Sequence, residues 1–225
     1  MKPMTLGILV GIAAIATSFQ PTYALAEETA KELAERALLE CEQGRSATGR
    51  DARLVHYQQG QTLAEQAVAA DDRNSDAHFA LFCNLGEQLR LDGESVTSVF
   101  GFRRMMSELD RALELDPSHV DALSAKGTLL VRLPGILGGD QEKGEELLQQ
   151  VVKQAPKAVN ARLVLAKIRS ERGRHQEAMM LASDALAIAQ KHKRNTFISE
   201  AKAVLQQVRS NATGVTTASY TPRVR

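Results

Sequence analysis

Helix-length segments with a 3.6-residue apolar period fill most of this chain, and they end at nearly regular intervals. Three of the ends share one pattern, in which Pro or Gln stands five residues after an apolar residue. The last two ends are 34 residues apart and the first two are 39 apart. Such a period indicates stacked helical hairpins, an architecture that binds other molecules. The three pairs are Ala112 with Pro117, Val151 with Pro156, and Ala185 with Gln190.

The apolar stripes predict an all-α fold, because strand-like alternation is nearly absent. Turn signals containing Gly, Pro, Asp or Asn separate the stripes. Aromatic residues make up only 4% of the chain and Trp is absent, which suits helices packed through Ala and Leu. The nine predicted helices cover residues 27–43, 51–71, 75–91, 95–115, 119–132, 140–155, 157–172, 174–191 and 195–209.

The N-terminal segment is predicted to be a signal peptide over residues 1–26. Lys2 supplies a positive start, and an apolar run follows over residues 6–16. Leu25 follows with a small residue on each side of it, which is a typical cleavage signal, and cleavage is expected between Ala26 and Glu27. The sequence therefore predicts export, most simply to a bacterial periplasm. An uncleaved anchor in the inner membrane is the alternative.

Cys41 and Cys83 are the two cysteines of the chain. Cys41 lies on the apolar stripe of its helix, which favours two buried thiols. An exported protein can also oxidise such a pair, and a bridge is possible if the first and third helices are neighbours. The sequence leaves both possibilities open and favours the thiols.

The last predicted repeat resembles the tetratricopeptide repeat. Ala166, Gly173, Ala178 and Ala185 occupy positions where that family has small residues, because its two helices cross closely. Residues 118–156 repeat the pattern after a five-residue insertion, and residues 75–117 repeat it more loosely. The resemblance covers about 61–190. It departs from the family at the position early in the first helix of each repeat where the family has an aromatic residue. His78, Leu123 and Arg162 stand there.

This resemblance implies a right-handed superhelix of helical hairpins that binds a protein or peptide without catalysis. The implied organisation is a helix pair at 27–74, hairpins at 75–117, 118–156 and 157–190, and a capping helix at 195–209. We expect a disordered tail over 211–225. In this family the first helix of each hairpin lines a concave groove. The implied groove residues are Asp76, Phe79, Cys83, Asp121, Ser124, Thr128, Arg132, Asn160, Leu163 and Lys167.

The insertion at 133–140, with Lys143 after it, resembles a turn in exported tetratricopeptide proteins of the TRAP transporter T-component type. That family would imply a small apolar ligand, a solute-binding protein as partner and an enclosed apolar cavity. The chain lacks the family's lipoprotein cysteine. The cavity is expected at Phe79, Phe82, Leu85 and Phe100.

The same insertion also has a structural interpretation, which we favour. Pro134 ends one helix, Gly138 and Gly139 permit positive φ, and Asp140 caps the next helix. A phosphate-binding loop is disfavoured because Asp140 and the acidic residues behind it would repel the anion.

Catalytic and cofactor-binding patterns are missing from the sequence. The five histidines follow no metal-ligand spacing, and no nucleophile elbow, Walker or dinucleotide-binding pattern occurs. A net charge of +1 gives no reason to expect nucleic acid or an anionic membrane. The sequence therefore predicts a non-enzymatic scaffold in the cell envelope that needs no cofactor and no metal. It identifies neither the partner nor the oligomeric state.

Overall fold

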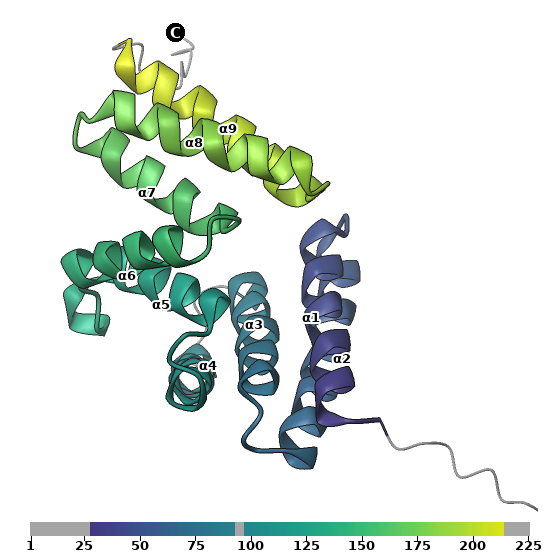
Figure 1. Ribbon diagram of the computed structural model, residues 1–225. Helices are drawn as coiled ribbons and strands as arrows, with labels where there is room; N and C mark the ends of the chain where they lie inside the picture. Colours follow the sequence, from purple (N-terminus) through teal and green to yellow (C-terminus); the bar gives the residue numbers. More distant parts are fainter. Residues whose placement is uncertain (1–27, 93–96, 214–225) are drawn as a thin grey trace, which may run out of the picture.

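A computed structural model describes residues 28–92 and 97–213 (Figure 1). The predicted signal peptide, with its cleavage between Ala26 and Glu27, lies outside the described residues. So does most of the tail predicted to be disordered. The elements of the described part are α1 (Ala30–Ser46), α2 (Arg50–Ala70), α3 (Ser75–Asp92), α4 (Thr97–Leu115), α5 (Val120–Arg132), η1 (Gly135–Leu137), α6 (Gln141–Gln154), α7 (Val159–Glu171), α8 (His175–Lys191) and α9 (Asn195–Ala212).

The all-α fold is confirmed in the described residues. Every predicted helix is present, and its ends lie within three residues of the predicted ones. The largest differences are at both ends of α1 and at the end of α9, which takes in Asn211 and Ala212. The 3₁₀ helix η1 was not predicted, because a single turn carries no apolar period.

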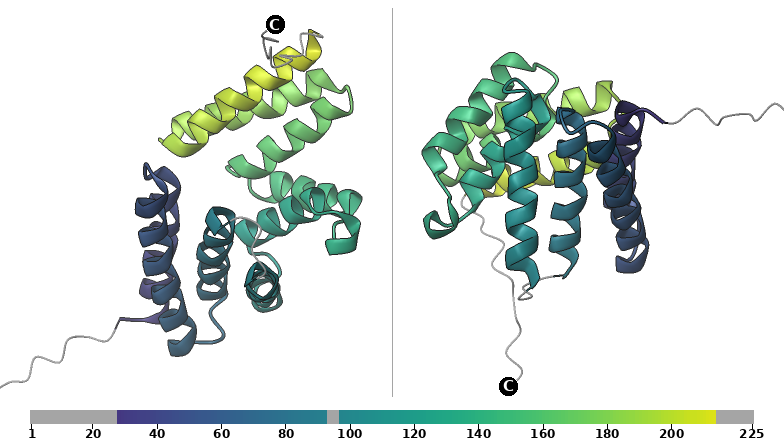
Figure 2. Two further views of the ribbon diagram at one scale, coloured as in Figure 1. Left: turned by 180° about the vertical axis from the view of Figure 1, so that it is seen from behind. Right: turned by 90° about the horizontal axis from the view of Figure 1, so that it is seen from below.

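Consecutive helices pack as hairpins, and α9 packs against α7 and α8. The array curves, so that the turn between α8 and α9 comes round toward the α1–α2 hairpin (Figures 1 and 2). Four apolar clusters lie along it. The first cluster holds α1, α2, α3 and α4 together, and the second holds α3 and α4 against α5. The third lies among α5, α6, α7 and α8, and the fourth among α7, α8 and α9. The core is therefore a continuous series of helix contacts, as expected of a stacked array.

Close crossing of α5 and α6 depends on two glycines. A Cβ atom at Gly144 would lie 2.7 Å from the carbonyl oxygen of Gly127. A Cβ at Gly127 would lie 2.9 Å from Cγ of Leu148. The backbones could not approach this closely with larger residues. This confirms the steric reason for small residues at this crossing.

The turn between α5 and α6 follows the structural interpretation of its sequence. After Pro134 the chain forms η1, and Gly138 adopts φ 85°. The carboxylate of Asp140 accepts a hydrogen bond of 3.0 Å from the backbone N–H of Lys143, which caps α6 as predicted. Gly139 is needed for another reason: a Cβ there would lie 1.7 Å from the carbonyl oxygen of Leu133.

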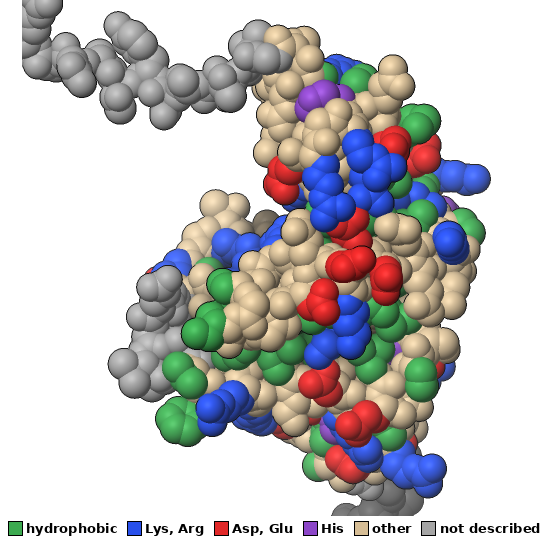
Figure 3. Space-filling model, turned by 90° about the vertical axis from the view of Figure 1, so that its left-hand side faces the viewer, with side chains coloured by type: hydrophobic (Ala, Val, Ile, Leu, Met, Phe, Trp, Pro, Cys, Tyr) green, Lys and Arg blue, Asp and Glu red, His purple; other side chains and the backbone are tan. Residues whose placement is uncertain are grey.

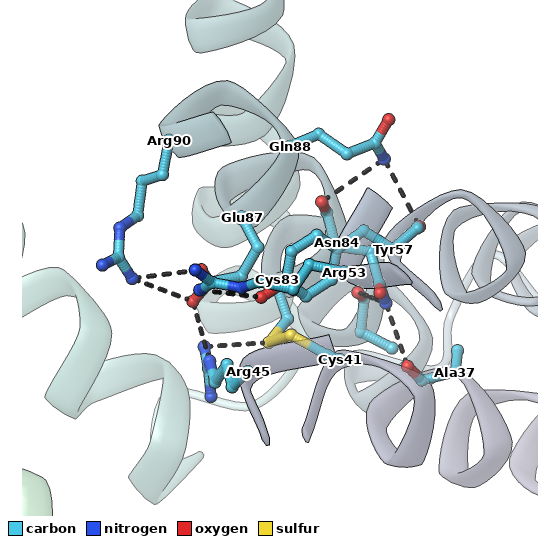
Figure 4. The surroundings of a disulfide bond; sticks show 11 residues. Ala37, Cys41, Arg45, Arg53, Tyr57, Cys83, Asn84, Glu87, Gln88 and Arg90 are labelled. Carbon is cyan, nitrogen blue, oxygen red and sulfur yellow. Dashed lines mark hydrogen bonds and ion pairs between the residues drawn. A yellow bond between two sulfur atoms is a disulfide. The ribbon is translucent and has the colours of Figure 1, made fainter. Parts of the chain in front are cut away.

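Cys41 of α1 and Cys83 of α3 form a disulfide, with their Cα atoms 6.4 Å apart (Figure 4). The prediction of two buried thiols was therefore wrong, although both side chains are buried as predicted. The reason is that α1 packs directly against α3 as well as against α2. This long-range contact brings the two cysteines within bonding range.

Buried polar groups surround the disulfide and tie α1 to α3. The amide nitrogen of Asn84 donates to the backbone carbonyls of Ala37 at 3.0 Å and Ala80 at 2.9 Å. The buried carboxylate of Glu87 accepts from Arg45 at 2.7 Å and Arg90 at 3.0 Å. The amide nitrogen of Asn84 and the carboxylate of Glu87 therefore have partners across this contact, whereas the buried amide oxygen of Asn84 accepts no hydrogen bond from the described residues.

Candidate binding surface

The seam between α5 and α7 brings together polar side chains from the two predicted inner helices. Asn160 of α7 donates through its amide nitrogen to the hydroxyl of Ser124 at 3.1 Å and to that of Thr128 at 3.4 Å. The Thr128 hydroxyl in turn donates to the carbonyl of Ser124 at 2.7 Å. These groups form a hydrogen-bonded row on one side of α5, because their positions in α5 are four apart.

Two exposed charges extend this row along α5. Asp121 stands three residues before Ser124, and Arg132 four residues after Thr128, so all four occupy one helix face. Both charged side chains are exposed and belong to no ion pair in the described part of the chain. We call Asp121, Ser124, Thr128, Arg132 and Asn160 the α5–α7 seam.

Three further predicted groove residues lie beyond the seam, on α7 and α3. Lys167 of α7 forms an ion pair of 3.2 Å with Glu200 of α9. In α3, an oxygen of Asp76 lies 3.1 Å from Nε2 of His119, and the Phe79 ring lies 4.9 Å from the ring of His119. Since Nδ1 of His119 accepts from the backbone N–H of Ala122, Nε2 carries the proton and faces Asp76.

Three predicted groove residues are buried, and one of them, Ser124, belongs to the seam. Leu163 is fully buried in the cluster that joins α7 to α9, and Cys83 is buried in the disulfide. The predicted groove is therefore divided. Four of its residues lie on the α5 side of the seam, and others contact neighbouring helices. Leu163 and Cys83 cannot reach a ligand in this conformation.

An open cleft of about 600 Å³ lies elsewhere, between the start of α3 and one side of α4. The cleft could not be predicted from the sequence: eight of its ten residues lie on α4 but follow no motif, and the other two come from α3 and the turn before it. It contains acidic, basic and apolar side chains. Its lining residues are Asp72, His78, Phe102, Arg103, Met106, Ser107, Glu108, Asp110, Arg111 and Glu114.

His78 is the group in this cleft with the most obvious catalytic potential, and it is fully engaged. The side chain is buried, its Nδ1 lies 2.7 Å from a carboxylate oxygen of Glu108, and its Nε2 lies 3.0 Å from the carbonyl oxygen of Asp72. Neither nitrogen is free to accept a proton from a substrate. His78 therefore holds the start of α3 against α4.

The residues expected around an enclosed apolar cavity do not form one. Phe79 and Phe82 stack on each other with ring centroids 5.8 Å apart, and both pack into the contact between α3, α4 and α5. Leu85 is buried in the core, whereas Phe100 is 75% exposed. Within the described residues, this arrangement gives the small-ligand alternative no support.

Charged side chains of both signs alternate over the face shown in Figure 3, and no large area of one sign is visible there. Four ionisable groups within 28–92 and 97–213 have shifted pKa values, and each has a local cause. In the case nearest the seam, burial lowers the pKa of the Arg162 guanidinium, and the charge of Asp184 opposes this effect.

Over the described ranges, no helix is long and apolar enough to cross a membrane, and no group of three His, Cys, Asp or Glu side chains could hold a metal ion.

Comparisons with known proteins place few limits on the function. No protein-family model matches the chain, and no curated protein matches it. The solved structure of MamA (AMB-1) is similar to it, with 20% sequence identity over 81% of this chain and 98% of that one, at a TM-score of 0.45. We draw no functional conclusion from a likeness at this level. The fold class rests on the helices and hairpins described above.

Proposed function

We propose that the protein is a non-enzymatic, tetratricopeptide-like scaffold that binds a protein or peptide partner along the α5–α7 seam. The observation that carries this proposal is the pair of half-buried side chains Thr128 and Asn160, which the buried Ser124 holds in place, with an exposed charge at each end of the row. Hydroxyl, amide and charged groups in a row suit the polar backbone and side chains of a peptide.

The rest of the described surface is consistent with binding rather than chemistry. The histidine of the open cleft has both ring nitrogens engaged. The α5–α6 hairpin, which carries four of the seam residues, is closely packed around Gly127 and Gly144. A surface that is already ordered loses little conformational entropy of its own on binding.

We further propose that the protein is exported and that its signal peptide is cleaved between Ala26 and Glu27. The disulfide between Cys41 and Cys83 supports this, since structural disulfides are formed and kept in oxidising compartments. N-terminal sequencing of the protein from a periplasmic fraction tests it. We expect a mature chain that begins at Glu27. A protein that starts at Met1 and remains in the cytoplasm would contradict the proposal.

Charge reversal tests the seam directly. The test variant is Asp121→Lys with Arg132→Glu, and the matched control is Glu171→Lys with Arg209→Glu, which reverses the same two kinds of exposed charge elsewhere. Tagged chains are used to purify partners from envelope extracts. We expect the parent chain and the control to recover the same protein, and the test variant to lose it. Equal recovery by all three would rule out the seam.

A further inference from the structure

The near-neutral chain is strongly polarised between its two halves. Residues 28–118 carry 17 acidic and ten basic side chains, whereas residues 119–213 carry nine acidic and 15 basic ones. The division falls between α4 and α5, so helices α1–α4 form an acidic half and α5–α9 a basic half. Such a separation of charge orients and attracts charged partners, although the net charge hides it.

Unpaired basic side chains gather at one edge of the basic half. Helices α7 and α9 pack side by side and both begin at this edge (Figure 1). The turns that lead into them, together with the ends of α6 and α8, carry five basic residues. None of the five has an ion pair with a described acidic side chain. These residues, the basic edge, are Lys153, Lys157, Lys191, Lys193 and Arg194.

Several basic side chains elsewhere in this half have acidic partners among the described residues, although single exposed ones do not, such as Arg132, Lys202 and Arg209. Glu145 pairs with Arg169 at 2.6 Å and with Arg172, and Glu177 pairs with Arg174 at 2.6 Å. At the basic edge, by contrast, the first turns of α7 and α9 contain no acidic residue. The edge therefore keeps its full positive charge.

Lys193 occupies a backbone position that normally favours glycine. It has φ 53°, and it is the one non-glycine residue with positive φ in the described chain. The turn before α8 is built in the same way, with matching hydrogen bonds, but has Gly173 at this position with φ 75°. A lysine in the left-handed region is strained, because its Cβ comes too close to the following carbonyl oxygen. A lysine retained despite this strain points to a use for its charge.

We propose that the basic edge is a second interaction surface, which binds an acidic protein segment rich in Asp and Glu. The acidic half of the chain disfavours a long polyanion such as nucleic acid, because the array curves and the polyanion would meet like charge. A membrane surface is disfavoured because, among the described residues, no exposed large apolar side chain lies beside the basic ones, so that only electrostatic attraction to the headgroups would hold it there. The exposed large apolar residues lie on α1, α2, α4, η1 and α8, and none lies in the two turns.

The basic edge and the α5–α7 seam share no residue, although Lys157 stands three residues before Asn160. The two proposals are tested with different probes and different variants, so that one can fail without the other. A fluorescein-labelled, Glu-rich decapeptide serves as the probe, and fluorescence anisotropy with the full chain at low salt measures its affinity. A Gln-rich decapeptide of equal length is the peptide control. We expect the Glu-rich peptide to bind, with an affinity that falls as the salt concentration rises. The Gln-rich peptide should not bind.

Variants localise the binding. Lys157→Glu with Lys193→Glu should weaken the affinity about tenfold, and the same positions changed to Gln should give a smaller loss. Lys202→Glu with Arg209→Glu makes the same change in net charge elsewhere on α9, and we expect a loss of less than about threefold. Circular dichroism checks that each variant is folded.

Three results would overturn the proposal. The first is an equal loss of peptide affinity when Lys157 and Lys193, or Lys202 and Arg209, are changed to Glu. This would indicate a general electrostatic attraction and no binding site at the basic edge. The second is binding to vesicles that contain phosphatidylglycerol but not to the peptide. The third is self-association of the chain, seen by sedimentation and abolished by the Lys157 and Lys193 changes, without peptide binding. The third result would assign the edge to the acidic half of a second copy.

Discussion

At the scale of single residues, buried groups that depend on one another hold the contact between α1 and α3. The disulfide joins the helices covalently, and the amide nitrogen of Asn84 and the carboxylate of Glu87 find partners across the same contact (Figure 4). A buried polar group that loses its partner costs more than the hydrogen bond itself contributes. Changes here should therefore have large effects on stability.

Reduction of the disulfide should strongly destabilise the fold. The bond closes a loop between residues 42 positions apart, which corresponds to about 4 kcal/mol of stabilisation in the chain-entropy treatment. Urea denaturation with and without reductant measures the difference. Cys41→Ala with Cys83→Ala is the control, since its midpoint should not respond to reductant. An unchanged midpoint in the parent chain, with both thiols shown to be free, would contradict this prediction.

Gly60→Ala tests how tightly α2 meets α3. The added Cβ would lie 2.2 Å from Oδ1 of Asn84, whose amide nitrogen is held by two carbonyls and cannot retreat. We expect a loss of about 1–3 kcal/mol in the free energy of unfolding. Gly135→Ala is the matched control because nothing lies within 4 Å of its Cβ. Similar stabilities for the two variants would argue against this packing.

The disulfide could not be predicted firmly from the sequence. The apolar stripe of α1 correctly indicated that Cys41 is buried, since burial within a helix follows a local period. Whether two cysteines meet depends on which helices are neighbours, and this is decided by the packing of the whole array. The burial of Leu163 has a similar cause: helices α8 and α9 cover α7 together, so a residue expected in the groove is part of the core.

At the scale of helices and turns, local signals determine most of the structure. Apolar periods gave the helices, and Pro, Gly and capping residues gave their ends. Asp140 was correctly predicted to cap α6, because this signal depends only on the neighbouring residues. The left-handed residue before α9 was not predicted, since Lys193 gives none of the local signal that Gly173 gives before α8.

The two related turns should respond in opposite directions to substitution. Gly173→Ala places a Cβ at φ 75° and should destabilise the fold by about 1–2 kcal/mol. Lys193→Gly removes a Cβ at φ 53° and should stabilise it by about 0.5–1 kcal/mol, after the larger chain entropy of glycine is deducted. Thermal unfolding measures both changes. Stabilisation by Gly173→Ala would show that the left-handed conformation is not held there.

The turn between α4 and α5 should contribute less to the stability of the fold at acidic pH. Hydrogen bonds from the hydroxyl and then the backbone N–H of Ser118 hold the pKa of Asp116 below its usual value of 3.8. A lowered pKa in the folded state gives stability that is present above the usual pKa and is lost as the pH falls through the lower one. The melting temperature lost in Asp116→Ala should therefore be larger at neutral pH than near pH 2. A carboxyl pKa at or above the usual value, measured by NMR, would contradict this.

At the scale of the whole molecule, the arrangement of the helices creates features that no single segment reveals. The α5–α7 seam joins residues from two hairpins, and the basic edge joins two turns more than 30 residues apart. The spacing of Asp121, Ser124, Thr128 and Arg132 predicted their common helix face. The hydrogen bonds from Asn160 to Ser124 and Thr128 follow from three-dimensional packing. So does the absence of acidic partners for the basic edge within the described part of the chain.

Site-specific photo-crosslinking in living cells tests the central claim, that this array binds a protein partner through its α5–α7 seam. The crosslinker replaces Asp121 or Arg132 on α5, with Glu146 or Gln150 on α6 as exposed control positions. The account predicts one common protein adduct from both α5 positions and none from the α6 positions. No adduct from α5, or the same adduct from all four positions, would contradict it.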